Sequence, residues 1–96
     1  MAITFDPAKN ATNIATRGLS SERVAEFGWS EALLVDDNRR DYGERRVRVF
    51  ALLDGRLHIA VITPRGEDVR VISLRRASQK ETNLYEAEKG RSRRTP

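Results

Sequence analysis

The sequence feature that most constrains the fold is a pair of β-rich runs on either side of an Asp-Gly dipeptide. Residues 45–66 read RRVRVFALLDGRLHIAVITPRG, with Asp54 and Gly55 in the middle. A two-residue type I′ turn needs positive φ at both turn positions, and Asp-Gly is one of the dipeptides that tolerate it. The apolar residues on both sides follow the pattern of strands that face a core. The segment therefore predicts an antiparallel hairpin.

Further strands are expected before and after this hairpin. The segment TPRGED at 63–68 predicts a second turn, and VRVISL at 69–74 alternates as a strand that pairs back. The segment ALLVDD at 32–37 predicts a strand that ends in a polar loop, and AITF at 2–5 predicts a short one. We therefore expect three or four antiparallel strands that form a meander.

Helix signals flank the predicted strands at the N-terminal side. Asp6 is suited to cap a helix with Pro7 at its first position, and Gly18 is suited to end it. Ser20 would cap a second helix, with Leu19 packing onto Val24 from outside its first turn. Two helices are therefore expected before residue 30.

A third helix is expected after the last strand. Ser78 and Glu81 have the S-x-x-E spacing of a capping box, which predicts a helix through about Lys89. The expected fold class is α+β, with an antiparallel meander sheet, two N-terminal helices and a C-terminal helix.

The length and charge of the chain predict one small domain with a basic tail. Lys and Arg total 14 and Asp and Glu total 14 over residues 1–88, so the net charge of +4 comes from the last residues. We expect a single domain at 1–89 and a disordered basic tail at 90–96. No apolar run approaches the ~20 residues of a membrane span, and the first residues lack the pattern of a secretory signal. A cytoplasmic protein without membrane contacts is the expectation.

Several chemistries lack the residues they need. The chain has no cysteine and one histidine, so thiolate chemistry and a serine–histidine triad are unsupported. His58 stands mid-strand without nearby carboxylates at ligand spacing, and we expect it on the half-exposed face of its strand. Asp36 and Asp37 would point to opposite faces of a strand. No metal site and no cofactor are therefore expected.

Arginine remains as the residue type that can carry function. Fifteen of the eighteen cations are arginine, whose planar fork suits phosphate and carboxylate groups. Arg46, Arg48 and Arg70 would share one sheet face if the meander pairs as expected, whereas Arg75 and Arg76 would lie at a strand-to-helix corner. The face could bind an anionic backbone, or it could be solvated and paired with nearby acids. Glu44, Glu67 and Asp68 are the acids available for such pairing.

Four segments, in this order and spacing, resemble the BrnT family of toxins. They are ITFDPAKNATNIATRG, DNRRDYGERR, DGRLHIAVITPRG and VRVISLRRASQKETNLYE, which together span roughly residues 3–88. The resemblance implies a RelE-like fold and a metal-independent endoribonuclease of a type II toxin–antitoxin pair that inhibits translation. It also implies a ribbon-helix-helix antitoxin as partner, RNA as substrate, and operator DNA reached only through the antitoxin.

The resemblance, together with the arginine clusters, suggests which residues carry function. The catalytic candidates are Arg65, Arg70, Arg75, Tyr42, Lys80 and Tyr85. The candidates for RNA binding are Lys9, Asn13, Arg17, Arg39, Arg46, Arg48 and Arg76. Ser73 and Glu81 also match family positions, although Ser73 could simply end a strand and Glu81 could serve only the helix cap.

One position departs from the family pattern. Relatives usually read Lys-His-Gly where this chain reads Thr16-Arg17-Gly18. Arginine keeps a cation there but cannot act as acid or base near neutral pH. Tyr42, Tyr85, Lys80 and Glu81 then remain as candidates for proton transfer. The alternative function is a catalytically impaired module that grips the antitoxin and binds nucleic acid without cleaving it.

Overall fold

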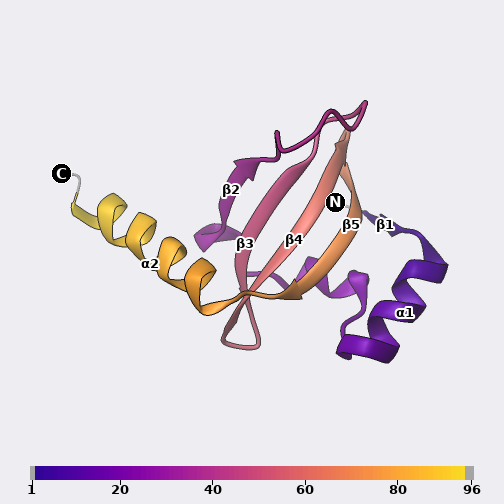
Figure 1. Ribbon diagram of the computed structural model, residues 1–96, viewed down its shortest axis with the longest axis horizontal. Coiled ribbons are helices and arrows are strands. Elements are labelled where there is room, and N and C mark those ends of the chain that lie inside the picture. Colours follow the sequence, from indigo (N-terminus) through magenta and orange to yellow (C-terminus); the bar gives the residue numbers. More distant parts are fainter. Residues whose placement is uncertain (1, 95–96) are drawn as a thin grey trace.

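The computed structural model describes residues 2–94, and side chains within 2–90 (Figure 1). Within these residues, five strands form one sheet in the order β1-β5-β4-β3-β2. The elements in chain order are β1 (Ile3–Phe5), α1 (Pro7–Arg17), the 3-10 segments η1 (Ser21–Glu26) and η2 (Trp29–Glu31), β2 (Leu33–Asp36), β3 (Val47–Leu53), β4 (Arg56–Arg65), β5 (Asp68–Arg76) and α2 (Gln79–Arg94). The expected α+β class is therefore confirmed.

The central hairpin forms as predicted. Asp54 and Gly55 have φ values of 53° and 75°, so both turn positions are left-handed as a type I′ turn requires. Gly66, with φ of 61°, turns β4 back into β5. Strands β2 to β5 pair consecutively and antiparallel.

The expectation of an entirely antiparallel sheet is wrong at β1. This strand pairs parallel with β5, with Ile3 opposite Val69 and Phe5 opposite Val71. The amide of Ala2 donates to the carboxylate of Asp68 at 3.0 Å, which helps to fix the register. Only the outer edge of β5 is open to β1, because β4 occupies the other edge. The direction of that pairing depends on the path of the whole chain, for which the sequence carries no local signal.

The first predicted helix is confirmed, and the second is a 3-10 segment instead of an α-helix. Asp6 caps α1 by accepting from the amides of Ala8 and Lys9, and Gly18 ends it with φ of 69°. Ser20 caps η1 as predicted, but this segment ends at Glu26. The next residue, Phe27, is buried in the core, and 3-10 segments are generally short.

The C-terminal helix begins with the predicted capping box. The Ser78 amide donates to Glu81 at 2.8 Å, and the Glu81 amide donates to the Ser78 hydroxyl at 3.2 Å. The helix continues past Lys89 to Arg94. Side chains 91–96, which include the arginines of the predicted tail, lie outside the described residues, so the disordered tail stays a prediction.

The sheet has two differently covered faces. Its inner face packs against η1 and the residues around it, and its outer face is covered at one end by α2, which projects from the sheet (Figure 1). The inner core consists of Leu19, Val24, Phe27, Val47, Val49, Ala51, Leu53, Ala60, Ile62, Val69, Val71 and Leu74. Under α2, the outer core consists of Phe50, Leu57, Ile59 and Tyr85.

His58 corrects one prediction about the sheet. It is 4% exposed and lies opposite Ala51 of the inner core, not on a half-exposed face. Its Nδ1 lies 2.9 Å from the carbonyl oxygen of Arg56. The neighbouring segments cover this end of β4 from both sides, which an alternating pattern within one strand does not reveal.

Candidate functional site

A β-bulge determines which arginines of β5 share a face. Between β4 and β5 the register shifts at Val61 and Ile62, so Ile72 has no partner on β4. Arg70 lies opposite Thr63 and Arg75 lies opposite Ile59. Those two β4 residues are four apart and point the same way. Strict alternation would put Arg70 and Arg75 on opposite faces, so the bulge brings both to the outer face.

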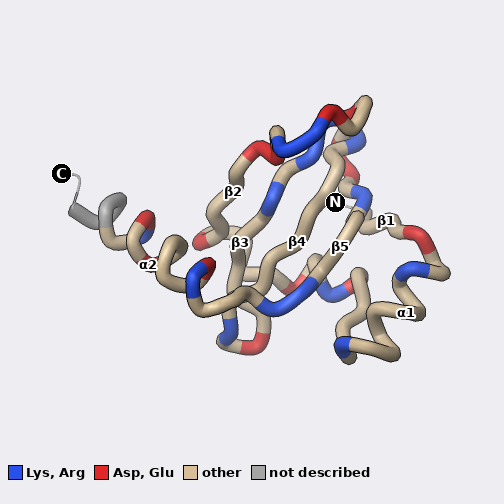
Figure 2. Tube along the Cα trace, viewed as in Figure 1, with Lys and Arg blue, Asp and Glu red and all other residues tan. Residues whose placement is uncertain are grey.

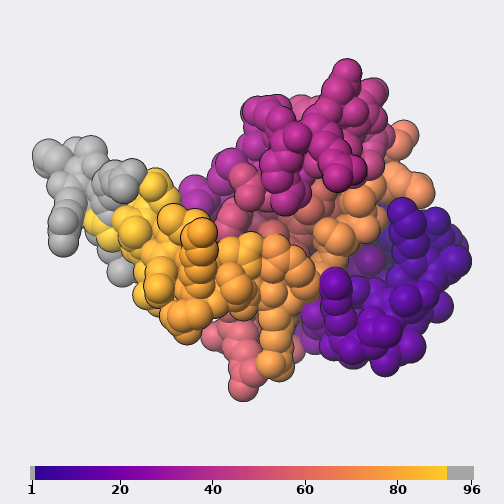
Figure 3. Space-filling model, viewed as in Figure 1, coloured from indigo at the N-terminus to yellow at the C-terminus, as the bar shows by residue number. Residues whose placement is uncertain are grey.

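The open part of the outer face is lined by cations from two strands, and we call it the arginine face. Its residues are Arg48 of β3, Val61 and Thr63 of β4, and Arg70 and Ser73 of β5. Figure 2 shows cationic segments on β3, on β5 and in the 37–46 loop around it. In Figure 3 this face is framed by that loop, α2 and α1. The prediction that Arg48 and Arg70 share a face is confirmed, and Arg46 directly precedes β3.

Arg48 and Arg70 are the cations of this face that form no ion pair within the described side chains, although the charge of Arg48 acts on the buried Asp37 carboxylate. Neither has an ion pair among the described residues. The Nε of Arg48 is also buried without a hydrogen-bond partner there. A buried donor without a partner is costly. Burial of this atom therefore leaves an unmet hydrogen bond at Arg48.

Arg75 is held at the edge of the face by a carboxylate of α2. Its guanidinium donates to both carboxylate oxygens of Glu81, at 2.7 and 2.8 Å. These bonds lower the pKa of Glu81 to about 2, although partial burial acts in the opposite direction. Glu81 therefore serves the helix cap and also neutralises and orients Arg75. Two of the predicted site residues are thus bound to each other.

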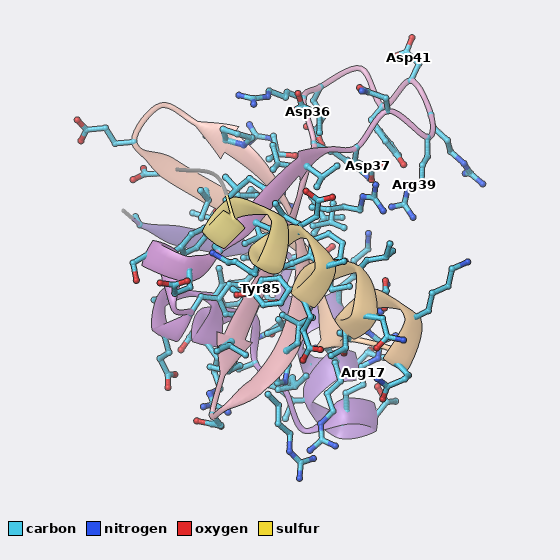
Figure 4. All side chains as sticks on the ribbon, turned by 90° about the vertical axis from the view of Figure 1, so that its left-hand side faces the viewer. Arg17, Asp36, Asp37, Arg39, Asp41 and Tyr85 are labelled. Carbon is cyan, nitrogen blue, oxygen red and sulfur yellow. The ribbon has the colours of Figure 1, made fainter. Side chains whose placement is uncertain are left out.

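A buried carboxylate in the 37–46 loop orients a further arginine. The Asp37 side chain is 1% exposed and accepts two bonds from Arg39, at 2.7 and 2.8 Å (Figure 4). These bonds hold the pKa of Asp37 well below its usual range, against the opposing effect of burial. Tyr42 adds a longer bond of 3.4 Å from its hydroxyl to the same carboxylate. The neighbouring Asp36, by contrast, is exposed and pairs with Arg45.

Arg39 and Arg75 lie near each other across the face. Glu81 raises the pKa of Arg75, whereas burial and the positive charge of Arg39 oppose that rise. The Arg39 side chain is 60% exposed, so its fork remains accessible despite its pairing with Asp37. The loop thus brings a preoriented cation toward the strand-to-helix corner.

Glu44 gathers another group of predicted site residues at the far end of the face. It pairs with Arg46 at 3.3 Å and with Arg65 at 3.5 Å, and it accepts from the Thr63 hydroxyl at 3.2 Å. Desolvation would raise the pKa of Glu44, but these hydrogen bonds and charges lower it overall. Arg46 also lies 4.1 Å above the centre of the Tyr42 ring. The alternative of surface ion pairing therefore applies to Arg46 and Arg65.

The predicted residues of α1 lie against the edge of β5. The Asn13 amide donates to the carbonyls of Leu19 and Leu74, at 2.8 and 3.2 Å. Arg17 donates to Asn13 at 3.2 Å and to the Leu74 carbonyl at 3.3 Å. Asn13 thus joins helix to sheet, and the exposed Arg17 is held beside the Arg75 corner. Lys9 is exposed one turn earlier.

The remaining predicted residues differ in their surroundings. Tyr85 is 8% exposed, and its hydroxyl donates to the Glu31 carbonyl at 2.8 Å beneath α2 (Figure 4). Lys80 and Arg76 are exposed, and neither has an ion pair among the described residues. The structure therefore groups the arginines of β3, β5 and the loop, and separates Tyr85 from them.

Two carboxylates that organise the site were not among the predicted site residues. Asp37 orients Arg39, and Glu44 orients Arg46 and Arg65. The interleaving of acids with arginines over residues 36–46 was a usable signal for both. No sequence signal indicated the bulge at Ile72, because the alternation in VRVISLRR is that of an unbroken strand.

Two other kinds of site have no candidates among the described residues. Among residues 2–94, no three His, Cys, Asp or Glu side chains gather as metal ligands would. None of the described helices combines the length and apolar character that spanning a membrane requires.

Comparison with known families places the chain in a class. A family model described as "Ribonuclease toxin, BrnT, of type II toxin-antitoxin system" matches residues 5–81. The class is therefore that of the ribonuclease toxins of type II toxin–antitoxin systems, in which the partner is an antitoxin. Within this class, the chain belongs to the BrnT family, and the resemblance inferred from its four segments is confirmed. No curated protein matches the chain.

Proposed function

We propose that the chain is a metal-independent endoribonuclease that binds and cleaves RNA on the arginine face. The observation that carries this proposal is the pair of cations without ion pairs among the described residues, Arg48 and Arg70, beside the oriented forks of Arg39 and Arg75. Arginine forks suit phosphate oxygens in both geometry and charge. Ordered cations of this kind favour a reaction in which negative charge builds up on phosphate.

The reaction would use the RNA's own 2′-hydroxyl as nucleophile. The 2′-oxygen forms a bond to the adjacent phosphorus while the bond from phosphorus to the 5′-oxygen breaks, which leaves a 2′,3′-cyclic phosphate and a 5′-hydroxyl. The protein then needs to orient the backbone, stabilise the crowded anionic phosphorus and move two protons. Arg48 and Arg70 would bind the phosphoryl oxygens.

Proton transfer would fall to the side chains whose hydrogen bonds leave them available. Tyr42 lies at the margin of the arginine face, with its hydroxyl bound only loosely to Asp37, and Lys80 is exposed at the start of α2. These two are the proposed proton carriers. Tyr85 is assigned a structural role, because its hydroxyl is buried and bound to a backbone carbonyl.

The proposed biological setting follows from the family. The fold would be RelE-like, the enzyme would inhibit translation in the cytoplasm by cutting RNA, and a ribbon-helix-helix antitoxin would neutralise it. The toxin would reach operator DNA only through that antitoxin. Lys9, Asn13, Arg17 and Arg76 would extend RNA binding from the arginine face toward α1 and the strand-to-helix corner.

The test is a double variant, Arg48→Ala with Arg70→Ala, compared with Arg56→Ala as a matched control. Arg56 is exposed beside the hairpin turn and lies away from the arginine face. The double variant should fold, lose RNA cleavage and weaken the salt dependence of binding to a 2′-O-methyl RNA. Each lost phosphate contact reduces the slope by about 0.7 on a single strand. Full cleavage by the folded double variant would remove these two arginines from the site.

A second candidate function is a module that binds antitoxin and nucleic acid without cleaving. The observation in its favour is Arg17, which takes the place of the family's histidine and is held by the Leu74 carbonyl. Deleting residues 90–96 separates the two functions. A binder that relies on its tail would lose nucleic-acid affinity and salt dependence, whereas the nuclease would continue to cut.

A further inference from the structure

A groove next to the arginine face shares Arg70 with it and adds an apolar lining that the phosphate contacts proposed above do not use. It lies between α1 and β5, has a volume of about 160 Å³, and is visible in Figure 3 as the hollow between them. Its lining includes Phe5, Lys9, Asn13, Arg70, Ile72 and Ser73. Arg70 belongs to both the groove and the arginine face, so the two sites are continuous.

The groove exists because β1 is shorter than its partner strand. Pairing with β1 ends where Phe5 meets Val71, whereas β5 continues to Arg76. Beyond that point α1 takes the place of a strand along the edge of β5. Asn13 ties the helix to the Leu74 carbonyl, and the Asn10 side chain accepts from the Ser21 amide at 2.7 Å. The walls are therefore held in place by hydrogen bonds.

The lining combines an apolar surface with polar groups that have no hydrogen-bond or ion-pair partner among the described residues. Phe5 and Ile72 supply partly buried apolar surface. Among the described residues, the Ser73 hydroxyl has no hydrogen-bond partner, and Lys9 and Arg70 have no ion pair. The one carboxylate, Asp6, already accepts from two amides of α1. A flat ring with a polar edge and a neighbouring negative charge fits this combination.

The size of the groove limits what can enter. Sites for drug-sized ligands measure about 300–1,000 Å³, so about 160 Å³ has room for one small ring system. A base inside a duplex cannot enter such a groove, because its edges and faces are covered by pairing and stacking.

We propose that the groove is a nucleobase subsite that takes one unpaired base beside the cleaved bond. Arg70 and Lys9 bind the phosphates on either side of that nucleotide, and the Ser73 hydroxyl contacts the polar edge of the base. This inference rests on the proposed ribonuclease function and adds to it a preference for single-stranded RNA at a fixed position.

The test uses the full chain with Ser73→Leu, which fills the groove, and Thr12→Leu, a control on α1. Thr12 is exposed and does not line the groove. Binding is measured with short single-stranded 2′-O-methyl RNAs in which each base in turn is removed. For the wild type and Thr12→Leu, one abasic position should weaken binding at least about 5-fold, the low end of the range for single-base contacts. For Ser73→Leu that position should make no difference, and the salt dependence should be unchanged.

Cleavage mapping on a randomised single-stranded RNA separates this inference from the proposed function. The wild type should prefer certain bases at one position, and Ser73→Leu should flatten that preference while its melting temperature stays close to that of Thr12→Leu. If the wild type cuts but Ser73→Leu keeps the same base preference, the subsite is wrong and the nuclease stands. If the wild type does not cut yet discriminates one abasic position, the nuclease is wrong and the subsite stands. Equal binding of all abasic RNAs by the wild type overturns the subsite.

Discussion

At the scale of single residues, carboxylates determine which arginines are free to act. Glu81 neutralises Arg75, Asp37 neutralises Arg39, and Glu44 pairs with two arginines. Arg48 and Arg70 have no such partner among the described residues. Within the arginine face, Arg48 and Arg70 are therefore the two cations without an ion pair, and exposed cations outside it, such as Arg76 and Lys80, also lack one among the described residues.

Asp37 and its neighbour Asp36 offer a matched pair of substitutions. Asp37→Asn removes the charge and one acceptor from a buried side chain, so we expect a loss of about 1–3 kcal/mol in the free energy of unfolding. RNA cleavage per folded molecule should fall by about 10-fold or more, because Arg39 loses its fixed orientation. Asp36→Asn should change both quantities little, since that carboxylate is exposed. Urea unfolding and single-turnover cleavage measure the two effects, and equal effects of the two substitutions would refute the role of Asp37.

The low pKa of Glu81 predicts how the stability of the fold changes at acidic pH. Its pKa is about 2 in the folded protein, whereas an unperturbed Glu has a pKa of about 4.3. Because the folded pKa is the lower one, the stabilisation is complete above about pH 5 and is lost as the pH falls toward 2. The wild type should therefore be more stable than Glu81→Gln at pH 7, and the difference should shrink between pH 5 and 2. Urea midpoints across this range measure it, and parallel curves would contradict it.

At the scale of secondary-structure elements, a substitution in the hairpin turn should lower the stability of the fold without lowering its activity. Gly55 has φ of 75°, so Gly55→Ala should destabilise the fold by about 1 kcal/mol through strain at the turn. Cleavage per folded molecule should be unchanged, because the turn lies at the opposite end of β3 from the 37–46 loop. Thermal unfolding and cleavage assays check both expectations. A loss of activity without a loss of stability would show that the turn contacts the substrate.

The elements that could be predicted from sequence are those specified by local signals. The Asp54-Gly55 turn, the Asp6 cap and the Ser78–Glu81 capping box each need only a few neighbouring residues, and all three form. The parallel pairing of β1 and the burial of His58 depend on segments far away in the chain.

The sequence predicted several residues of the candidate site, but not which of their side chains contact one another. Arginine spacing identified Arg48 and Arg70 as sharing a face, and the register confirms it. The spacing could not show that Arg75 joins them, because that depends on the unpaired Ile72. Nor could it show that the Tyr85 hydroxyl is bound to the Glu31 carbonyl, a contact between residues far apart in sequence.

At the scale of the whole molecule, the position of the cations matters more than their number. Residues 1–88 carry equal numbers of positive and negative side chains, so net charge alone gives this region no affinity for RNA. The sheet nevertheless presents on one face two arginines, Arg48 and Arg70, that have no ion pair among the described residues, and this face is framed by α1, α2 and the 37–46 loop (Figure 3). The proposed activity depends on this local separation of charge.

The most direct test of the central claim is RNA cleavage by the purified, antitoxin-free protein in EDTA. The substrate is a long, largely single-stranded RNA, with a 2′-deoxy copy of the same sequence as control. We expect the RNA to be cut to fragments with 2′,3′-cyclic phosphate ends and the 2′-deoxy copy to survive. Survival of both by a protein shown to be folded, or cleavage of the 2′-deoxy copy, would contradict a metal-independent ribonuclease that uses the 2′-hydroxyl.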